Sequence, residues 1–117
     1  MRRVIFFMTG LLILILAGCS NYEYPVDCPD GTPGASYSGD IQPIFNSSCV
    51  SCHSGGQAPD LSEGWSYDEL IEDGYVDTDS PCESELYTVF SGTHTGRATD
   101  EEILQILGWI QEGAQDN

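Results

Sequence analysis

The sequence has almost no positive charge. It contains no lysine, and three arginines, Arg2, Arg3 and Arg97, stand against nineteen Asp and Glu residues, which gives a formal net charge of −16 at pH 7. A surface of this kind is repelled by nucleic acid and by anionic lipid, so functions that depend on binding either of them are excluded. A partner that is steered by charge should carry a basic patch. The alternative is that the acidity serves only solubility or a saline habitat.

Methionine and sheet-forming patterns are also lacking. Both methionines, Met1 and Met8, lie within the first eight residues, so a chain that loses its N-terminal segment contains none. No stretch alternates apolar and polar residues for long enough to predict a sheet. The expected fold class is therefore all-α.

What the chain does contain is the run Cys49-Val50-Ser51-Cys52-His53. The order C-x-x-C-H is typical of the attachment site of a c-type haem. Two thiols separated by two residues can add to the two vinyl groups on one edge of a porphyrin, and the adjacent histidine then becomes the proximal ligand of the iron. The alternatives are a thioredoxin-like dithiol and one half of a zinc site, but the βαβ pattern or the second Cys/His pair that each requires is missing.

The N-terminus indicates export. Residues 1–18 comprise a short basic region, an apolar stretch and two small residues, which is the pattern of a signal peptide. The next residue is Cys19, and Leu16–Cys19 resembles the lipobox at which bacterial lipoproteins are cleaved and acylated. We therefore expect lipidation of Cys19, on an extracytoplasmic face of a bacterial membrane, with inner and outer membrane both possible. An ordinary secretory signal or a marginal membrane anchor is the alternative.

Two of the five cysteines remain after this assignment. If Cys19 carries lipid and Cys49 and Cys52 carry haem, Cys28 and Cys82 are left over. In an oxidising compartment two leftover thiols in a small domain most often form a disulfide. Free thiols or a metal-binding pair are the alternatives.

The remaining sequence predicts a tether followed by one helical domain. Proline, glycine and acidic residues are frequent in residues 19–37, which we interpret as a flexible tether, and residues 38–117 form the domain. Asp40 is expected to cap a helix that tolerates Pro43 in its first turn.

Three further helices are predicted by capping boxes, in which a serine or threonine precedes a glutamate by three residues. The pairs are Ser66 with Glu69, Ser80 with Glu83, and Thr99 with Glu102. The last of these opens the longest apolar-periodic segment, residues 103–110, which ends near Gly113. The domain thus has about four short helices.

These residues resemble a class I monohaem cytochrome c, and more narrowly the short planctomycete-type cytochrome c domains. The resemblance is carried by residues 40–45, by the motif at 49–53, by Trp109-Ile110 and by Gly113-Ala114, and it spans residues 38–114.

The resemblance implies a small domain built around one covalently attached haem c, with Phe45 and Trp109 at the crossing of the first and last helices. It implies electron transfer, or a haem-stabilised subunit of a larger membrane-associated complex. Its partners would be a redox protein and, through the lipid, the membrane. Many soluble cytochromes c dock through a ring of lysines, which this sequence cannot provide.

The sequence departs from this family at the sixth iron ligand. Such domains usually supply a methionine in the loop before the last helix, whereas here that loop contains His94, the only histidine besides His53. We therefore expect His53 and His94 to ligate the iron together, which gives a low-spin haem of low potential. If His94 is only an exposed or structural histidine, the iron has an open position, and a haem enzyme or a gas sensor becomes the alternative.

Overall fold

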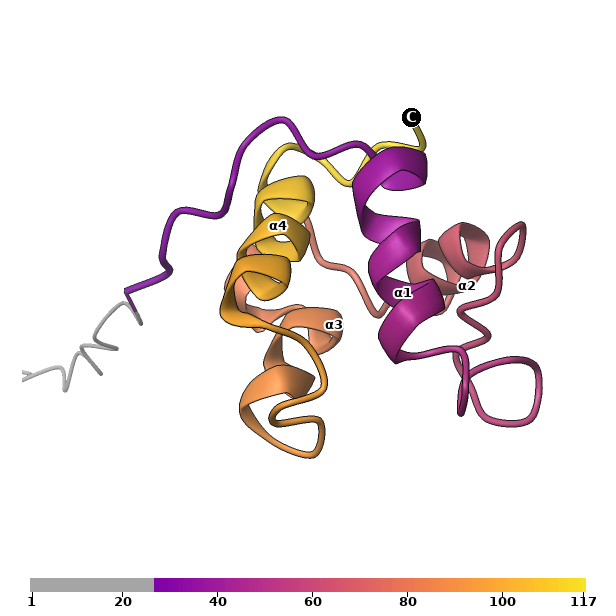
Figure 1. The fold of residues 1–117 in the computed structure, drawn as a ribbon. Helices are drawn as coiled ribbons and strands as arrows, with labels where there is room; N and C mark the ends of the chain where they lie inside the picture. Colours follow the sequence, from indigo (N-terminus) through magenta and orange to yellow (C-terminus); the bar gives the residue numbers. More distant parts are fainter. Residues whose placement is uncertain (1–26) are drawn as a thin grey trace, which may run out of the picture.

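The computed structural model describes residues 27–117 and consists of helices joined by loops (Figure 1). The predicted signal peptide, the predicted lipidation site Cys19 and the tether up to residue 26 lie outside the described residues. The elements in chain order are η1 (Tyr37–Ile41), α1 (Gln42–Ser48), α2 (Ser66–Glu72), η2 (Pro81–Glu83), α3 (Glu85–Thr88), η3 (Val89–Ser91) and α4 (Asp100–Gln111). The prediction of an all-α fold with four short α-helices is thus confirmed for this part of the chain, which contains no strand. None of its helices has the length and apolarity needed to span a membrane.

The first helical segment begins earlier than the sequence predicts. Ser36 is the cap, because its hydroxyl accepts a hydrogen bond from the backbone N–H of Gly39. The Asp40 carboxylate in turn accepts a hydrogen bond from the Ser36 N–H, at 2.8 Å. The prediction that Asp40 is the cap is wrong, since Asp40 lies inside the first turn and reaches back to Ser36. These two bonds hold the start of η1, and α1 follows η1 without a break.

Only one of the three predicted capping boxes forms. Thr99 and Glu102 make both reciprocal bonds at the start of α4, as predicted. Ser80 precedes only the short η2 and makes no side-chain cap. Ser66 is buried at the start of α2, where its hydroxyl donates to the Gln42 side chain and pairs with the Tyr37 hydroxyl. These partners from η1 and α1 take the hydroxyl that a local cap would have used, so the prediction for Ser66 is wrong.

The core lies where η1, α1 and α4 meet. Trp109 is 1% exposed, and its ring centre lies 5.2 Å from that of Tyr37 in η1. Phe45 is fully buried, and its ring centre lies 6.4 Å from that of Tyr37. Burial raises the pKa of Tyr37 to about 12, so its phenol stays neutral at ordinary pH. Tyr37 therefore packs against both Phe45 and Trp109, the two aromatic residues that the family resemblance places at the helix crossing.

The segment before η1 runs along α4 (Figure 1). The Thr32 N–H donates to the Leu104 carbonyl at 2.8 Å, and the Gly31 N–H donates to the Gln111 side chain at 2.8 Å. The contact is possible because Gly31 lies against Gly108, where a Cβ on either residue would overlap the backbone of the other element. Part of the segment interpreted as a tether therefore packs on the domain.

Replacing Gly108 with alanine is expected to lower the free energy of unfolding by about 1–3 kcal/mol. Alanine favours a helix by up to about 1 kcal/mol. The added Cβ would, however, overlap the Thr32 carbonyl oxygen, and neither backbone can move freely. Chemical unfolding of the purified variant measures the effect. Gly56→Ala is the control, because its Cβ meets no atom within 4 Å. Equal stability of the two variants would contradict this account of the contact.

The structure pairs Cys28 with Cys82 in a disulfide, across a sequence separation of 54 residues. In the chain-entropy account, closing a loop of this length stabilises the fold by about 4 kcal/mol. We expect Cys28→Ala/Cys82→Ala to lose a stability of this order in chemical unfolding. Intact mass should increase by two hydrogens when the unfolded wild-type protein is reduced. An unchanged mass would show that the bridge is absent.

Candidate functional site

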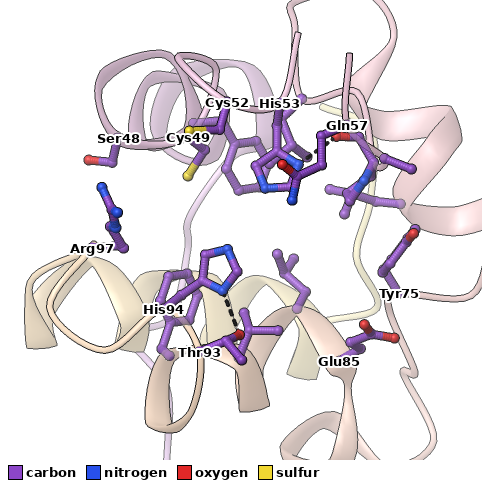
Figure 2. A pocket seen from close by; sticks show the side chains of 18 residues that line it. Ser48, Cys49, Cys52, His53, Gln57, Tyr75, Glu85, Thr93, His94 and Arg97 are labelled. Carbon is purple, nitrogen blue, oxygen red and sulfur yellow. Dashed lines mark hydrogen bonds between the residues drawn. The ribbon is translucent and has the colours of Figure 1, made fainter. Parts of the chain in front are cut away.

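The main cavity of the domain has a volume of about 430 Å³ and opens to solvent along one side. The end of α1 and the loop that follows it form one wall, while α3, η3 and the loop before α4 form the other (Figure 2). Its inner lining is apolar and consists of Phe45, Leu61, Leu70, Leu86, Val89 and Phe90. The volume is within the range of about 300–1,000 Å³ that is typical of small-molecule and cofactor sites.

The C-x-x-C-H motif forms one edge and one wall of this cavity. Cys49 directly follows α1, and the N–H groups of Cys52 and His53 both donate to its carbonyl, at 3.1 and 3.0 Å. This tight turn places the two thiols on the same edge of the cavity, and Figure 2 shows both sulfurs there. Cys49 is half-buried and Cys52 is exposed, and neither forms a disulfide.

His53 is oriented by a single hydrogen bond. The residue is 9% exposed, and its Nδ1 lies 3.0 Å from the Pro59 carbonyl oxygen. A carbonyl only accepts, so Nδ1 is the donor in this bond, and Nε2 is the ring nitrogen left to bind a metal. Metal-binding histidines are commonly fixed by this kind of bond from the second ring nitrogen. Leu61 closes the loop, since its N–H donates to the His53 carbonyl at 2.8 Å.

His94 lies on the opposite wall, in the loop between η3 and α4. Its backbone N–H donates to the Val89 carbonyl at 2.9 Å, and its Nδ1 lies 2.8 Å from the Thr93 hydroxyl. The rings of His53 and His94 face each other across the cavity (Figure 2), with centres 6.0 Å apart and an angle of 37° between their planes.

This separation fits one metal ion held between two imidazoles. A ring nitrogen binds a first-row metal at about 2 Å and lies about 1.1 Å from its ring centre, so two collinear ligands place their ring centres about 6 Å apart. The observed 6.0 Å agrees with this distance. With two thiols on one edge and an apolar interior, the donor set fits a covalently attached haem.

The environment of Cys49 argues against a redox dithiol. Burial raises the pKa of the Cys49 thiol, and the negative charge of Glu102 raises it further. Reactive dithiols instead have lowered pKa values, commonly at a helix N-terminus, whereas Cys49 lies at the C-terminal end of α1.

Within residues 27–117 no three His, Cys, Asp or Glu side chains are grouped so that they could hold a metal ion.

Arg97 is the only arginine or lysine that lines the cavity, and it lies near Ser48 on the same side as the cysteines (Figure 2). Its N–H donates to the His94 carbonyl at 3.0 Å, which makes it part of the same loop. The structure thus brings together Cys49, Cys52, His53 and His94, the four residues predicted to bind haem. Sequence reasoning missed Pro59 and Thr93, because a backbone carbonyl or a loop hydroxyl has no recognisable spacing relative to its partner.

Comparison with protein-family models, with curated proteins and with solved structures finds no match for this chain.

Proposed function

We propose that this protein is a c-type cytochrome that transfers single electrons through one covalently bound haem. The observation that carries the proposal is the pair of imidazoles, His53 and His94, which face each other across a cavity with an apolar inner lining and two free thiols on its edge. Haem iron between two histidines cycles between the ferric and ferrous states and has no free position for a substrate.

Each residue has a defined task in this proposal. Cys49 and Cys52 would hold the porphyrin through two thioether bonds, which prevent its loss in an exported protein. His53 would be the proximal ligand, fixed in one tautomer by the Pro59 carbonyl. His94 would be the distal ligand, supported by Thr93. The apolar side chains of the inner lining would pack against the porphyrin.

The potential of this haem should be low. Two imidazole ligands stabilise the ferric state relative to the His/Met pair that raises the potential of many cytochromes c. The excess of carboxylates over basic residues acts in the same direction, since negative charge stabilises the ferric iron. Arg97 at the cavity is the one side chain in the described residues with the opposite charge.

We further propose that the domain is exported and held at a bacterial membrane through lipid on Cys19. The residues before Cys19 support this, as does the disulfide, which is typical of oxidising compartments. Its electron-transfer partner would be another protein on the same side of the membrane.

Absorption spectra of the exported, purified protein test the proposal. Oxidised and reduced samples should show a covalently bound low-spin haem c without the weak near-infrared band that marks methionine ligation. Potentiometric titration should fit a one-electron process. A purified protein that contains no haem after expression with a complete haem-attachment system would disprove the proposal.

A second candidate is a sensor of a small gas, which requires a displaceable sixth ligand. His94 lies in a loop whose other members, from Gly92 to Arg97, are exposed to solvent, so few of its side chains are buried against the domain. Carbon monoxide separates the two functions. Rapid binding to the reduced wild-type protein would favour the sensor, whereas no binding is expected of the electron carrier.

A further inference from the structure

A second hollow lies beside the main cavity and has a volume of about 400 Å³. It is formed by the loop of residues 55–58, by Asp60, and by Trp65 and Glu69 at the start of α2. Gln57 and Ala58 line both hollows. The two sites are therefore separated only by the loop that follows His53.

The indole of Trp65 forms one side of this hollow and is left uncovered. Trp65 is 67% exposed, and in residues 27–117 it is the more exposed of the two large apolar side chains that lie at the surface. The other tryptophan, Trp109, is 1% exposed. Trp65 makes no side-chain capping bond to α2. Exposed tryptophans are enriched at protein interfaces, where they become the buried anchors of a complex.

Two carboxylates line the same hollow, and each accepts a hydrogen bond from a backbone N–H. Asp60 Oδ1 accepts the Ser62 N–H at 2.9 Å, and Glu69 Oε2 accepts the Asp60 N–H at 2.9 Å. These bonds fix the positions of both side chains, and an ionised carboxylate has about four acceptor sites, so both groups can accept further hydrogen bonds. Hydrogen bonds from the Ser62 side chain and backbone lower the pKa of Asp60, so it is charged at neutral pH. No basic residue lines the hollow.

We propose that this hollow docks an arginine side chain from a basic patch on a partner protein. A guanidinium can stack its flat face on the indole of Trp65 and donate to the Asp60 and Glu69 carboxylates at the same time. An ammonium group cannot do both equally well, because it is a compact point charge without a planar fork. The partner itself rests on the proposed electron-transfer function, whereas the arginine site does not.

The hollow lies beside the loop that holds the proposed proximal ligand, His53. Ala58 borders the hollow, and the next residue, Pro59, holds the His53 imidazole through its carbonyl. A partner seated on Trp65 would therefore lie over the loop that carries the proximal ligand. This placement brings the partner close to the haem on a face that the domain otherwise leaves to solvent.

Nuclear magnetic resonance of the haem-containing protein, with its iron in the ferrous state, tests the site. The chain has two tryptophans, so it has two indole N–H resonances, and the one from Trp109 is fixed by a bond to the Gln115 carbonyl at 2.9 Å. A hexa-arginine peptide should shift the Trp65 resonance and leave that of Trp109 unchanged. Hexalysine at the same concentration should bind several-fold more weakly.

Matched variants distinguish binding at this hollow from a general attraction of the peptide to the negative net charge of the protein. Trp65→Ala, Glu69→Gln and Asp60→Asn should each weaken hexa-arginine binding by about three- to fivefold in calorimetry. The two amide variants keep an oxygen for the hydrogen bond that each carboxylate accepts. Glu101→Gln, an equal charge change at an exposed position of α4, should leave the affinity within twofold.

Two results would overturn the proposal. If Glu101→Gln weakens binding as much as Glu69→Gln, the peptide responds only to net charge. If Trp65→Ala binds as tightly as the wild type, the indole is no part of a site. A domain that lacks haem but binds the peptide at Trp65 would reject the electron-transfer function and retain the arginine site.

Discussion

Replacing both Cys49 and Cys52 with alanine is expected to abolish covalent haem attachment completely. The two thiols lie on one edge of the cavity, and neither has a partner in a disulfide. No third free thiol lines the cavity. Intact mass should fall by one haem together with the two sulfur atoms, and haem staining on a denaturing gel should disappear.

The two single variants should behave differently from the double variant. Cys49→Ala and Cys52→Ala each leave one thioether, so each should retain stain on the gel at a reduced yield. Cys28→Ala/Cys82→Ala is the matched control, because it also removes two cysteines but none at the cavity. It should keep its haem, although its fold is less stable. Haem that survives denaturation in Cys49→Ala/Cys52→Ala would show that attachment uses other residues.

The double variant should also unfold more readily. Leu61, Leu70 and Phe90 line the cavity as well as belonging to the core, so a bound porphyrin would complete their packing. Without it, these apolar surfaces are left facing a large void or water. Comparison of thermal unfolding in the double variant and in Cys28→Ala/Cys82→Ala separates the loss of haem from the loss of a crosslink.

The helical architecture could be predicted from the sequence because its signals are local. The Thr99–Glu102 box formed as predicted, since both partners lie within one turn and no tertiary contact competes for them. Ser66 has the same local pattern but is buried against Gln42 and Tyr37, so its hydroxyl is used across the core. Propensity rules contain no information on such long-range partners.

The packing of residues 28–32 on α4 could not be predicted for a related reason. Proline and glycine in that segment interrupt periodicity, which is also the pattern of a flexible tether. What distinguishes the two is the close approach of Gly31 to Gly108 and the bond from Thr32 to Leu104, both separated by more than seventy residues. The candidate site shows the same division. The motif at 49–53 is local and recognisable, whereas the pairing of Pro59 with His53 is visible only in three dimensions.

Replacing His94 with alanine is expected to convert the haem from low-spin to high-spin. His94 is the only imidazole facing His53 across the cavity, at 6.0 Å between ring centres, so its removal leaves the sixth position to water. Water is a weaker-field ligand than imidazole. Ferric absorption and electron paramagnetic resonance spectra should both change completely, and the reduced variant should bind carbon monoxide.

Two further variants make this result specific to ligation. Thr93→Val removes the hydroxyl that lies 2.8 Å from His94 Nδ1 but leaves the ring in place, so the spectrum should stay low-spin. His94→Met should also stay low-spin, but with a higher potential, because thioether ligation favours the ferrous state. The choice of axial ligands changes the reduction potential of a haem over a range of roughly 0.8 V, so the potential of the His94→Met variant should be measurably higher than that of the wild type. A low-spin His94→Ala protein with the wild-type potential would remove His94 from the coordination of the iron. Since His94→Met keeps six ligands while His94→Ala does not, only a residue bound to the metal can give opposite spin states in the two variants.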